Sequence, residues 1–394
     1  MPSPTPTVPS APAGDGPLRS FGILSSFPPT ACGIATFSAA LAAGLVANGG
    51  TVDVVRCGAT PEMEDAMVLA ALGDGTPDAL GAALEVLNRT DVAIVQHEYG
   101  LYRGADGQDV VAVLEALTVP SIVVAHTVVH SPTANQRRVL EAVCDLAAVV
   151  VVMTETARTR LLDGFDVDSS KVMLIPHGAG TPLAAPSLAF DRPAGWPPRL
   201  LTWGLLGPGK GIEWAIDALA ELGDLRPRPS YVIAGATHPK VRARSGEAYR
   251  EMLVRRAASS GASPSVSFDD TYRDLASLTE LIHSADLVVL PYDSVDQVTS
   301  GVLVDAVAAG RPVVSTAFPH AVELLGSGAG IVVPQRDPAA LAEAIRAVLT
   351  DDSLAASMAA EARRLAPELS WNRVAGRYDE VAAGLLAARS GAPA

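Results

Sequence analysis

The segment GLLGPGK places two glycines and a lysine at the spacing of a phosphate-binding P-loop. Gly204, Gly209 and Lys210 match G-x-x-x-x-G-K. In a P-loop the next residue is Ser or Thr, whose hydroxyl binds magnesium, but here it is Gly211. A charge-assisted hydrogen bond from Lys210 to a phosphate would contribute roughly 1.5–3 kcal/mol. The alternative interpretation is a solvated lysine at the start of a helix.

A second anion site is indicated by the segment PYDSVDQVTSGVLVDAVAAGRPVVS, residues 291–315. An apolar strand ends, a polar loop follows, and a helix too small and apolar for the surface begins. Backbone N–H groups in the first turn of a helix bind anions. Asp305, the only charge on this helix, suits two ribose hydroxyls; alternatively it only favours the helix dipole. The amides that we expect to face a cleft are those of Ser300, Gly301, Val302 and Leu303.

Further polar residues follow apolar runs in the first half of the chain. PPTACGIATF opens a helix at Gly33, whose free N–H groups suit an anion, although a plain strand-to-helix turn would look the same. Three of the seven histidines, His97, His126 and His177, end such runs. Any one of them could be structural, but their shared position indicates that at least one touches substrate, and we select His126. A zinc site is an alternative with weak support, because no cysteine accompanies the histidines and their spacings are long.

The elements that must position these residues are short apolar strands alternating with helices. Continuous Val/Ile runs such as SIVVAHT and DLVVLPY are typical of parallel strands covered on both faces. The Pro-rich stretch 179–198 predicts a linker. We therefore expect an α/β protein with two doubly wound domains, at 18–190 and 191–368, facing a cleft. A disordered tail (1–17) precedes them, and a helix (369–394) is expected to cross back to the first domain.

Composition excludes several classes of protein. The formal net charge of −14 argues against nucleic-acid binding and disfavours an anionic membrane surface. The longest apolar stretch, LAAVVVVM, is too short for a bilayer span. The first seventeen residues lack the apolar segment of a signal peptide. The three cysteines show no metal spacing and indicate free thiols in a reducing compartment, so we expect a cytoplasmic protein.

Taken together, these motifs resemble the retaining, nucleotide-sugar-dependent glycosyltransferases of family 4, which have two Rossmann-like domains of the GT-B type. QVTSGVLVDAVAAGRPVV aligns without gaps with the family's E-P-F-G-x-x-x-L-E-A-x-A-x-G-x-P-V-V, and GLLGPGKG is similar to G-R-L-x-x-x-K-G. The glycine loop at Gly33, the AHT of His126, IPHG, and Ser370-Trp371 are also family features. The resemblance runs from Phe21 to about Leu386.

The resemblance implies transfer of a hexose from a nucleoside diphosphate sugar, without a metal or cofactor. Lys210 and the helix amides from Ser300 onward would bind the diphosphate, together with the Gly33 loop. Gln297 and Asp305 stand where the family has glutamates that hold the donor sugar and the ribose, and Leu205 replaces its arginine. His126 would orient the sugar at the reacting centre. The residues expected near the acceptor, a sugar or another hydroxyl compound, are His97, Tyr99 and Arg103.

Two alternatives remain on the same architecture. A sugar-nucleotide epimerase would need acid/base carboxylates in the cleft, and Gln297 offers none. A sugar-nucleotide-binding protein without turnover is favoured by the replaced glutamates and arginine. If a divalent metal were required, Asp293 and Asp296 would be the candidate ligands.

Overall fold

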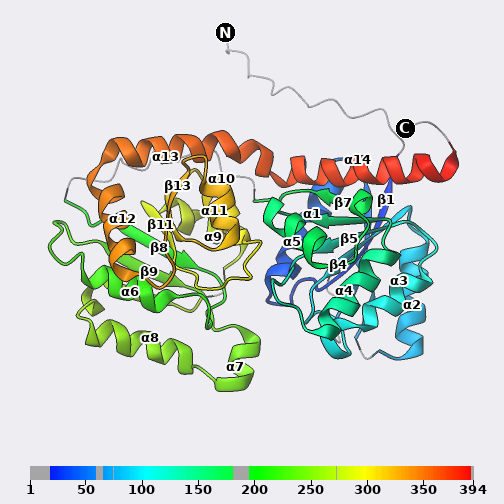
Figure 1. Cartoon of the computed structure of the whole chain (residues 1–394), viewed down its shortest axis with the longest axis horizontal. Helices are drawn as coiled ribbons and strands as arrows, with labels where there is room; N and C mark the ends of the chain where they lie inside the picture. Colours follow the sequence, from blue (N-terminus) through cyan, green and yellow to red (C-terminus); the bar gives the residue numbers. More distant parts are fainter. Residues whose placement is uncertain (1–17, 59–64, 74, 181–194, 272, 392–394) are drawn as a thin grey trace, which may run out of the picture.

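Two lobes lie side by side in the computed structural model, each built around a parallel sheet (Figure 1). The structure describes residues 18–58, 65–73, 75–180, 195–271 and 273–391. The predicted tail at 1–17 and most of the predicted linker at 179–198 therefore lie outside the described residues. No helix in these ranges is both long and apolar enough to cross a membrane.

The N-terminal lobe contains a seven-stranded sheet of order β3-β2-β1-β4-β5-β6-β7. Its strands are β1 (Ser20–Ser25), β2 (Thr51–Cys57), β3 (Val68–Leu72), β4 (Val92–His97), β5 (Ser121–Ala125), β6 (Val149–Val152) and β7 (Val172–Leu174). Its helices are α1 (Gly33–Ala47), α2 (Pro77–Asn88), α3 (Asp109–Ala116), α4 (Ala134–Leu146) and α5 (Glu155–Gly164). The edge strand β3 was not expected from the sequence, because its run of alanines carries little strand propensity.

The C-terminal lobe contains a six-stranded sheet of order β10-β9-β8-β11-β12-β13. Its strands are β8 (Arg199–Trp203), β9 (Ser230–Ala234), β10 (Val266–Asp269), β11 (Leu287–Leu290), β12 (Val313–Thr316) and β13 (Gly330–Val333). Its helices are α6 (Ile212–Ala220), α7 (Pro239–Ser245), α8 (Ala248–Ser259), α9 (Leu275–His283), α10 (Gly301–Ala308), α11 (Pro319–Leu325), α12 (Pro338–Thr350) and α13 (Asp352–Leu365). The predicted architecture of two doubly wound sheets is confirmed.

Both faces of each sheet are buried, as the continuous apolar strand sequences require. In β1, for example, Ile23 contributes to one hydrophobic cluster and Leu24 to the cluster on the opposite face. The order of strands reverses between β1 and β4 in one sheet and between β8 and β11 in the other. Loops diverge at such switch points and leave a crevice at the carboxyl ends of the strands. The Gly33 loop, the Lys210 loop and the polar segment before α10 follow β1, β8 and β11, which are the strands at these switch points.

The last helix, α14 (Trp371–Ser390), follows α13 along one edge of the molecule and lies over the N-terminal lobe (Figure 1). It packs on α1, and its buried residues, including Tyr378, join the core of that lobe. The Asp379 carboxylate accepts two hydrogen bonds from the Arg19 guanidinium, each 2.5 Å long. The chain therefore ends on the lobe in which it began.

Gly44→Ala in α1 should lower the free energy of unfolding, although Ala ordinarily favours a helix over Gly by about 1 kcal/mol. A Cβ at position 44 would lie 2.8 Å from the Cβ of Ala375 and 2.9 Å from the carbonyl oxygen of Trp371. Such overpacking destabilises by about 1–3 kcal/mol. Gly81→Ala in α2 is the matched control, because no atom lies within 4 Å of its Cβ position, and it should stabilise. Denaturant unfolding measures both; stabilisation by both would contradict close packing of α1 on α14.

Candidate active site

The N-terminus of α10 begins where predicted, but it offers two free amides instead of four. Ser300 is the N-cap, and its hydroxyl accepts a hydrogen bond of 3.3 Å from the Leu303 amide. The Ser300 amide donates to Nδ1 of His320 over 2.8 Å. The first four N–H groups of a helix have no acceptor within it. The expectation for Ser300 and Leu303 is corrected accordingly, and the amides of Gly301 and Val302 remain for an anion.

His320 is a site residue that the sequence did not single out. It lies on α11 just after β12, so it also follows a strand, the signal that drew attention to the histidines of the first half. Burial, and then the nearby His177, lower the pKa of His320 to about 3. Because Nδ1 accepts from Ser300, the proton of this neutral ring is on Nε2. His320 therefore holds the helix start in place without adding charge.

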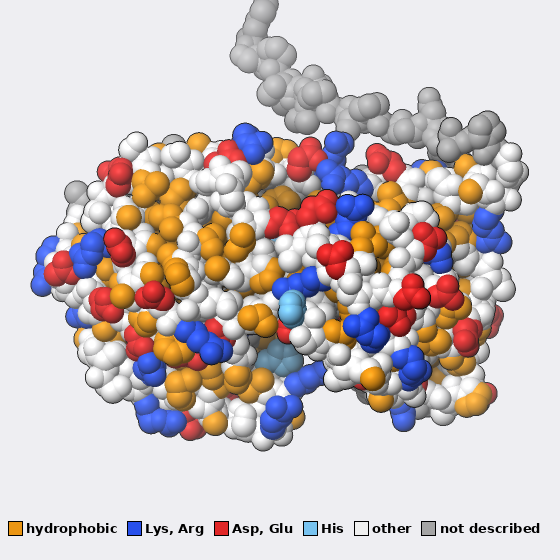
Figure 2. All heavy atoms as spheres, in the orientation of Figure 1, with side chains coloured by type: hydrophobic (Ala, Val, Ile, Leu, Met, Phe, Trp, Pro, Cys, Tyr) orange, Lys and Arg blue, Asp and Glu red, His pale blue; other side chains and the backbone are white. Residues whose placement is uncertain are grey.

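Three aromatic or imidazole rings of the N-terminal lobe form a cluster, and one of them, His177, meets the start of α10. The Phe37 ring contacts the rings of His126 and His177 edge-on, at centroid distances of 4.8 and 5.0 Å. A Cβ at Gly301 would lie 3.0 Å from two atoms of the His177 ring. A side chain at position 301 would therefore require the His177 ring to shift, and glycine lets the two lobes touch here without that shift. In Figure 2 the surface between the lobes is hollowed, with histidine side chains in the hollow.

His126 is held by a buried glutamine. Its Nε2 lies 2.6 Å from Oε1 of Gln96, a fully buried residue on β4. An amide oxygen only accepts, so Nε2 carries the proton and Nδ1 is left as an acceptor. Burial, followed by the proximity of His177 and His97, lowers the pKa of His126 to about 3. At neutral pH this ring can orient a hydroxyl group but is not a cation.

The expected acceptor residues are only partly at the surface. His97 is fully buried, and burial lowers its pKa to about 4. Tyr99 is 9% exposed and packs edge-on against the His97 ring. Arg103 is exposed. The structure buries the side chains of His97, the last residue of β4, and of Tyr99, so neither ring is presented to an acceptor. An acceptor near these residues stays a prediction, with Arg103 as the exposed member of the three.

The glycine loop after β8 differs from a P-loop in its backbone. Gly204, Gly209 and Gly211 have φ values of +113°, +89° and +60°, which favour glycine. A Cβ at Gly211 would lie 1.9 Å from the carbonyl oxygen of Pro291, so neither Ser nor Thr fits. Lys210 Nζ lies 4.1 Å from the centre of the Tyr292 ring, at the end of β11. The loop therefore presents a lysine next to the switch point, with no hydroxyl for magnesium.

Gly204 also approaches α10, since its Cβ position lies 3.5 Å from a Val302 methyl group. On the opposite side of the cleft, Gly33 is the first residue of α1, and no atom lies within 4 Å of its Cβ position. The structure thus brings the glycine loop, the α10 amides and the histidines of the N-terminal lobe together. At Gly33 there is space for a ligand next to the helix start, whose N-cap Cys32 accepts a hydrogen bond from the Ala35 amide.

The polar residues between β11 and α10 make protein contacts. Gln297 Nε2 donates to the carbonyl of Thr299, so its amide is turned along the loop. Asp293 pairs with Arg336 at 3.2 Å, and Asp296 with Arg160 at 3.6 Å. Within the described residues, no group of three or more His, Cys, Asp and Glu side chains could hold a metal ion.

Asp305 lies apart from Lys210. It lines a small pocket with Gly180 and residues of α9, including Leu275 and Thr279, and the glycine loop does not reach this pocket. Burial raises the pKa of Asp305 to about 7, and a hydrogen bond from the Gly180 backbone partly offsets this rise. The predicted ribose ligand is thus held next to the segment that joins the two lobes.

Two family models match the chain. The model described as Glycosyltransferase Family 4 matches residues 31–181, and the model described as Glycosyl transferases group 1 matches residues 197–351. The first match contains Gly33 and His126, and the second contains Lys210 and the whole of α10. The chain belongs to the GT-B glycosyltransferases of the family 4 kind.

Curated relatives in this family include two D-inositol 3-phosphate glycosyltransferases. That of Corynebacterium jeikeium is 29% identical over 60% of this chain and 58% of its own length. That of Salinispora arenicola is 30% identical over 68% of this chain and 64% of its own length. The chain therefore spans about three fifths of the length of these relatives.

Solved structures with the same fold include glycosyltransferases of low sequence identity. Sucrose-phosphate synthase from Thermosynechococcus elongatus superposes with a TM-score of 0.75 at 19% identity, covering 94% of this chain and all of that one. HepE of Anabaena, in complex with UDP-glucose, gives a TM-score of 0.72 at 17% identity, over 93% of this chain and all of that one. At these identities the likeness concerns the fold.

Gly211→Ser, which restores the P-loop residue, should destabilise the protein more than Gly391→Ser. Both glycines lie in the left-handed helical region, with φ and ψ of +60° and +20° at Gly211 and of +68° and +12° at Gly391, but no atom lies within 4 Å of the Cβ position of Gly391. A left-handed backbone costs each serine variant about 1–2 kcal/mol, and the collision with Pro291 should add about 1–3 kcal/mol at position 211 alone. Equal unfolding free energies in denaturant titrations would show that the backbone contact is absent.

Asp305→Asn should remove a pH dependence of stability. The pKa of Asp305 rises from its usual value of about 4 to about 7 in the folded protein. The folded protein then holds a proton that the unfolded chain has released, so wild-type stability falls as pH rises from about 4 to about 7. Asparagine does not titrate. The variant should gain stability relative to wild type across this range, and a constant difference in thermal unfolding from pH 5 to pH 8 would contradict it.

Proposed function

We propose that this protein transfers a hexose from a nucleoside diphosphate sugar to a hydroxyl group of an acceptor, with retention at the anomeric carbon. The observation that carries the proposal is the meeting of the two lobes at the start of α10. There, the open amides of Gly301 and Val302 lie between Gly204 of the glycine loop and the His177 ring. A helix start of this kind binds the phosphates of a leaving nucleotide.

Stabilising the departing diphosphate is the main task of such a site. As the sugar gains positive character, negative charge grows on the leaving group, and preorganised donors stabilise it best. Lys210 supplies the positive charge, and the α10 amides supply fixed dipoles. At the start of α1 the Cys32 side chain accepts from the Ala35 amide, and the Gly33 amide adds an N–H group from the other lobe. None of these groups needs a bound metal, so we propose that transfer is metal-independent.

The remaining residues act on the sugar and the ribose. His126 is neutral, so its part is to orient a sugar hydroxyl through Nδ1 at the reacting centre. Gln297 has to leave its contact with Thr299 to reach the donor sugar. Asp305 is assigned to the ribose, which requires the nucleoside to approach the pocket next to α9. Gln297 thus rearranges when the donor binds, whereas the nucleoside comes to Asp305.

The donor class is supported by relatives with the same fold. The HepE structure contains UDP-glucose, and the family members named above are glycosyltransferases for D-inositol 3-phosphate. Cys57 and Cys144 are buried free thiols, which supports a reducing compartment, and we place the reaction in the cytoplasm. The base, the sugar and the acceptor are the variables of the assay.

Transfer should proceed in excess EDTA at the rate seen with magnesium or manganese. The assay combines purified protein with a panel of labelled nucleoside diphosphate sugars and with acceptors that include inositol 3-phosphate. The anomeric configuration of the product is determined by NMR and should match that of the donor. Isomerised donor without acceptor would indicate an epimerase, and binding without turnover a binding protein. Activity lost in EDTA and restored by a metal would overturn the diphosphate site proposed here.

Lys210→Met should lower kcat/KM for the donor by roughly 10- to 150-fold, since a hydrogen bond to a charged group is worth about 1.5–3 kcal/mol. Lys171→Met is the matched control. Lys171 directly precedes β7 and so lies at the amino end of this strand, whereas the cleft lies at the carboxyl ends of the strands. Its ammonium donates to the Asp145 carbonyl. This control should retain wild-type kinetics, and an equal loss in both variants would remove Lys210 from the site.

A further inference from the structure

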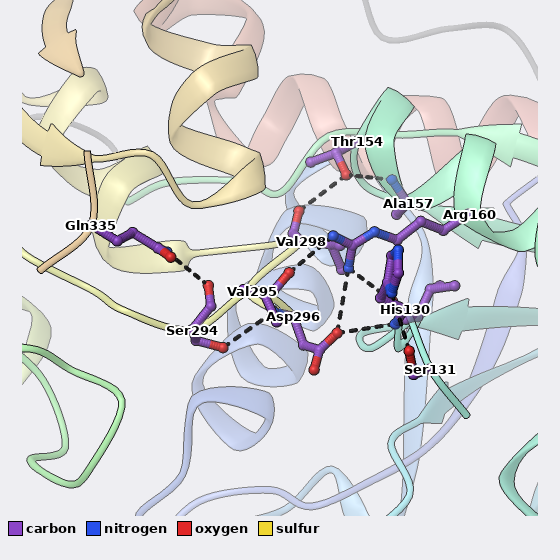
Figure 3. Close-up of polar contacts among 11 residues, drawn as sticks. His130, Ser131, Thr154, Ala157, Arg160, Ser294, Val295, Asp296, Val298 and Gln335 are labelled. Carbon is purple, nitrogen blue, oxygen red and sulfur yellow. Dashed lines mark hydrogen bonds and ion pairs between the residues drawn. The ribbon is translucent and has the colours of Figure 1, made fainter. Parts of the chain in front are cut away.

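The loop between β11 and α10 is held by the opposite lobe on both sides of Gln297 (Figure 3). On one side, the Asp296 carboxylate accepts a hydrogen bond of 3.0 Å from the His130 backbone amide. On the other side, the Val298 carbonyl accepts a hydrogen bond of 3.0 Å from the Thr154 hydroxyl. The C-terminal lobe thus contributes the loop, and the N-terminal lobe fixes its position.

Arg160 on α5 is the centre of these contacts. Its Nη2 donates to the Val295 carbonyl over 2.9 Å, and its Nη1 lies 3.6 Å from Asp296. Nη1 also reaches the Val128 carbonyl of its own lobe, at 3.5 Å. The Arg160 side chain is only 16% exposed, so these contacts are poorly screened by solvent. One guanidinium therefore ties the loop to the N-terminal lobe.

Val298 strengthens this attachment through apolar burial. Its side chain is 1% exposed and belongs to the hydrophobic cluster formed by the N-terminal lobe, although it precedes α10. The neighbours of Gln297 on both sides, Asp296 and Val298, thus face the N-terminal lobe. From the C-terminal lobe, Gln335 donates to the Ser294 carbonyl at the beginning of the loop.

A separate contact brings α5 and the C-terminal lobe together. The Glu323 carboxylate of α11 accepts hydrogen bonds from the amides of Glu155 and Thr156, at 2.8 and 3.1 Å, and from the Thr156 hydroxyl. These amides are the first two of α5, where a carboxylate is favoured by the helix dipole. The start of α5 is therefore docked independently of Arg160.

We infer that Arg160 and Thr154 are positioning residues for the donor, an inference that rests on the proposed function. They fix residues 294–298 of the opposite lobe and thereby place Gln297 and the start of α10. A donor loop held in this way is preorganised only when the lobes are together. Donor binding in the C-terminal lobe is then coupled to contact with the acceptor-side lobe, so that a complete donor site exists only in the closed enzyme.

The test compares Arg160→Ala with Arg158→Ala. Arg158 lies on the same helix, its side chain is 43% exposed, and it pairs with Glu155 at 3.6 Å. Hydrogen–deuterium exchange of the full-length protein without ligand should be at least tenfold faster at the amides of residues 294–303 in Arg160→Ala, and unchanged in Arg158→Ala. Equal exchange in the two variants would overturn the inference. Asp296→Asn, at a side chain that is 44% exposed, is a second variant that should also accelerate exchange and should fold if Arg160→Ala does not.

Kinetics then separate positioning from a merely structural role. Arg160→Ala should raise the donor KM by tenfold or more, and the double variant with Asp296→Ala should lose less than the product of the two single losses. Thr154→Ser should behave as wild type, because it retains the hydroxyl, whereas Thr154→Val should not.

An unchanged donor KM in Arg160→Ala would overturn the inference even if exchange is faster. If the wild-type protein consumes no nucleoside diphosphate sugar, the proposed function fails, and the exchange data still decide whether the loop is held.

Discussion

The close approach of the α10 backbone to the His177 ring is the contact around which the candidate site is arranged. A Cβ at Gly301 would lie 3.0 Å from this ring, so a larger residue at position 301 would require the ring to shift. The glycine lets the backbone of α10 come directly against the N-terminal lobe, and its first amides open into the region between the lobes. Gly211 has the corresponding place within the C-terminal lobe, because the loop carrying Lys210 passes against the Pro291 carbonyl. These two close backbone approaches bring together the groups that we propose bind phosphate.

The electrostatics of the site follow from burial. His126, His177 and His320 all have pKa values lowered to about 3 or 4, chiefly by burial. They are therefore neutral hydrogen-bonding groups at physiological pH. Position 205 is leucine where the family has arginine, so Lys210 is the positively charged residue that remains in the glycine-loop motif. Fixed dipoles and neutral rings in a site shielded from water can stabilise a developing anion without the desolvation penalty of further buried charges.

The sequence predicted those features that local patterns determine. Strand ends and the start of α10 depend on neighbouring residues, so the fold and the position of this helix could be identified. The phosphate-binding roles of Lys210 and of the α10 amides stay predictions. The Ser300 amide donates a hydrogen bond to His320, which is twenty residues further along the chain. This contact depends on how α11 packs, and no local sequence pattern predicts it. The burial of His97 and the place of Asp305 under Gly180 are likewise tertiary. Residues after a strand end can face the cleft or the core, and their spacing alone does not decide between the two.

The contacts between the lobes differ in what they hold. α14 lies on the N-terminal lobe through a buried apolar face and the Arg19–Asp379 ion pair, independently of the contacts at the cleft. The β11–α10 loop is held to the same lobe by hydrogen bonds from Arg160 and Thr154 and by the buried Val298 side chain, and the start of α5 is held separately by Glu323. The net free energy of one hydrogen bond is only about 0.5–1.5 kcal/mol, so the polar contacts and the burial of Val298 fix the loop jointly. The attachment of α14 and the attachment of the loop therefore lie on different elements. This division allows a substitution at Arg160 to act on the loop without disturbing the packing of α14.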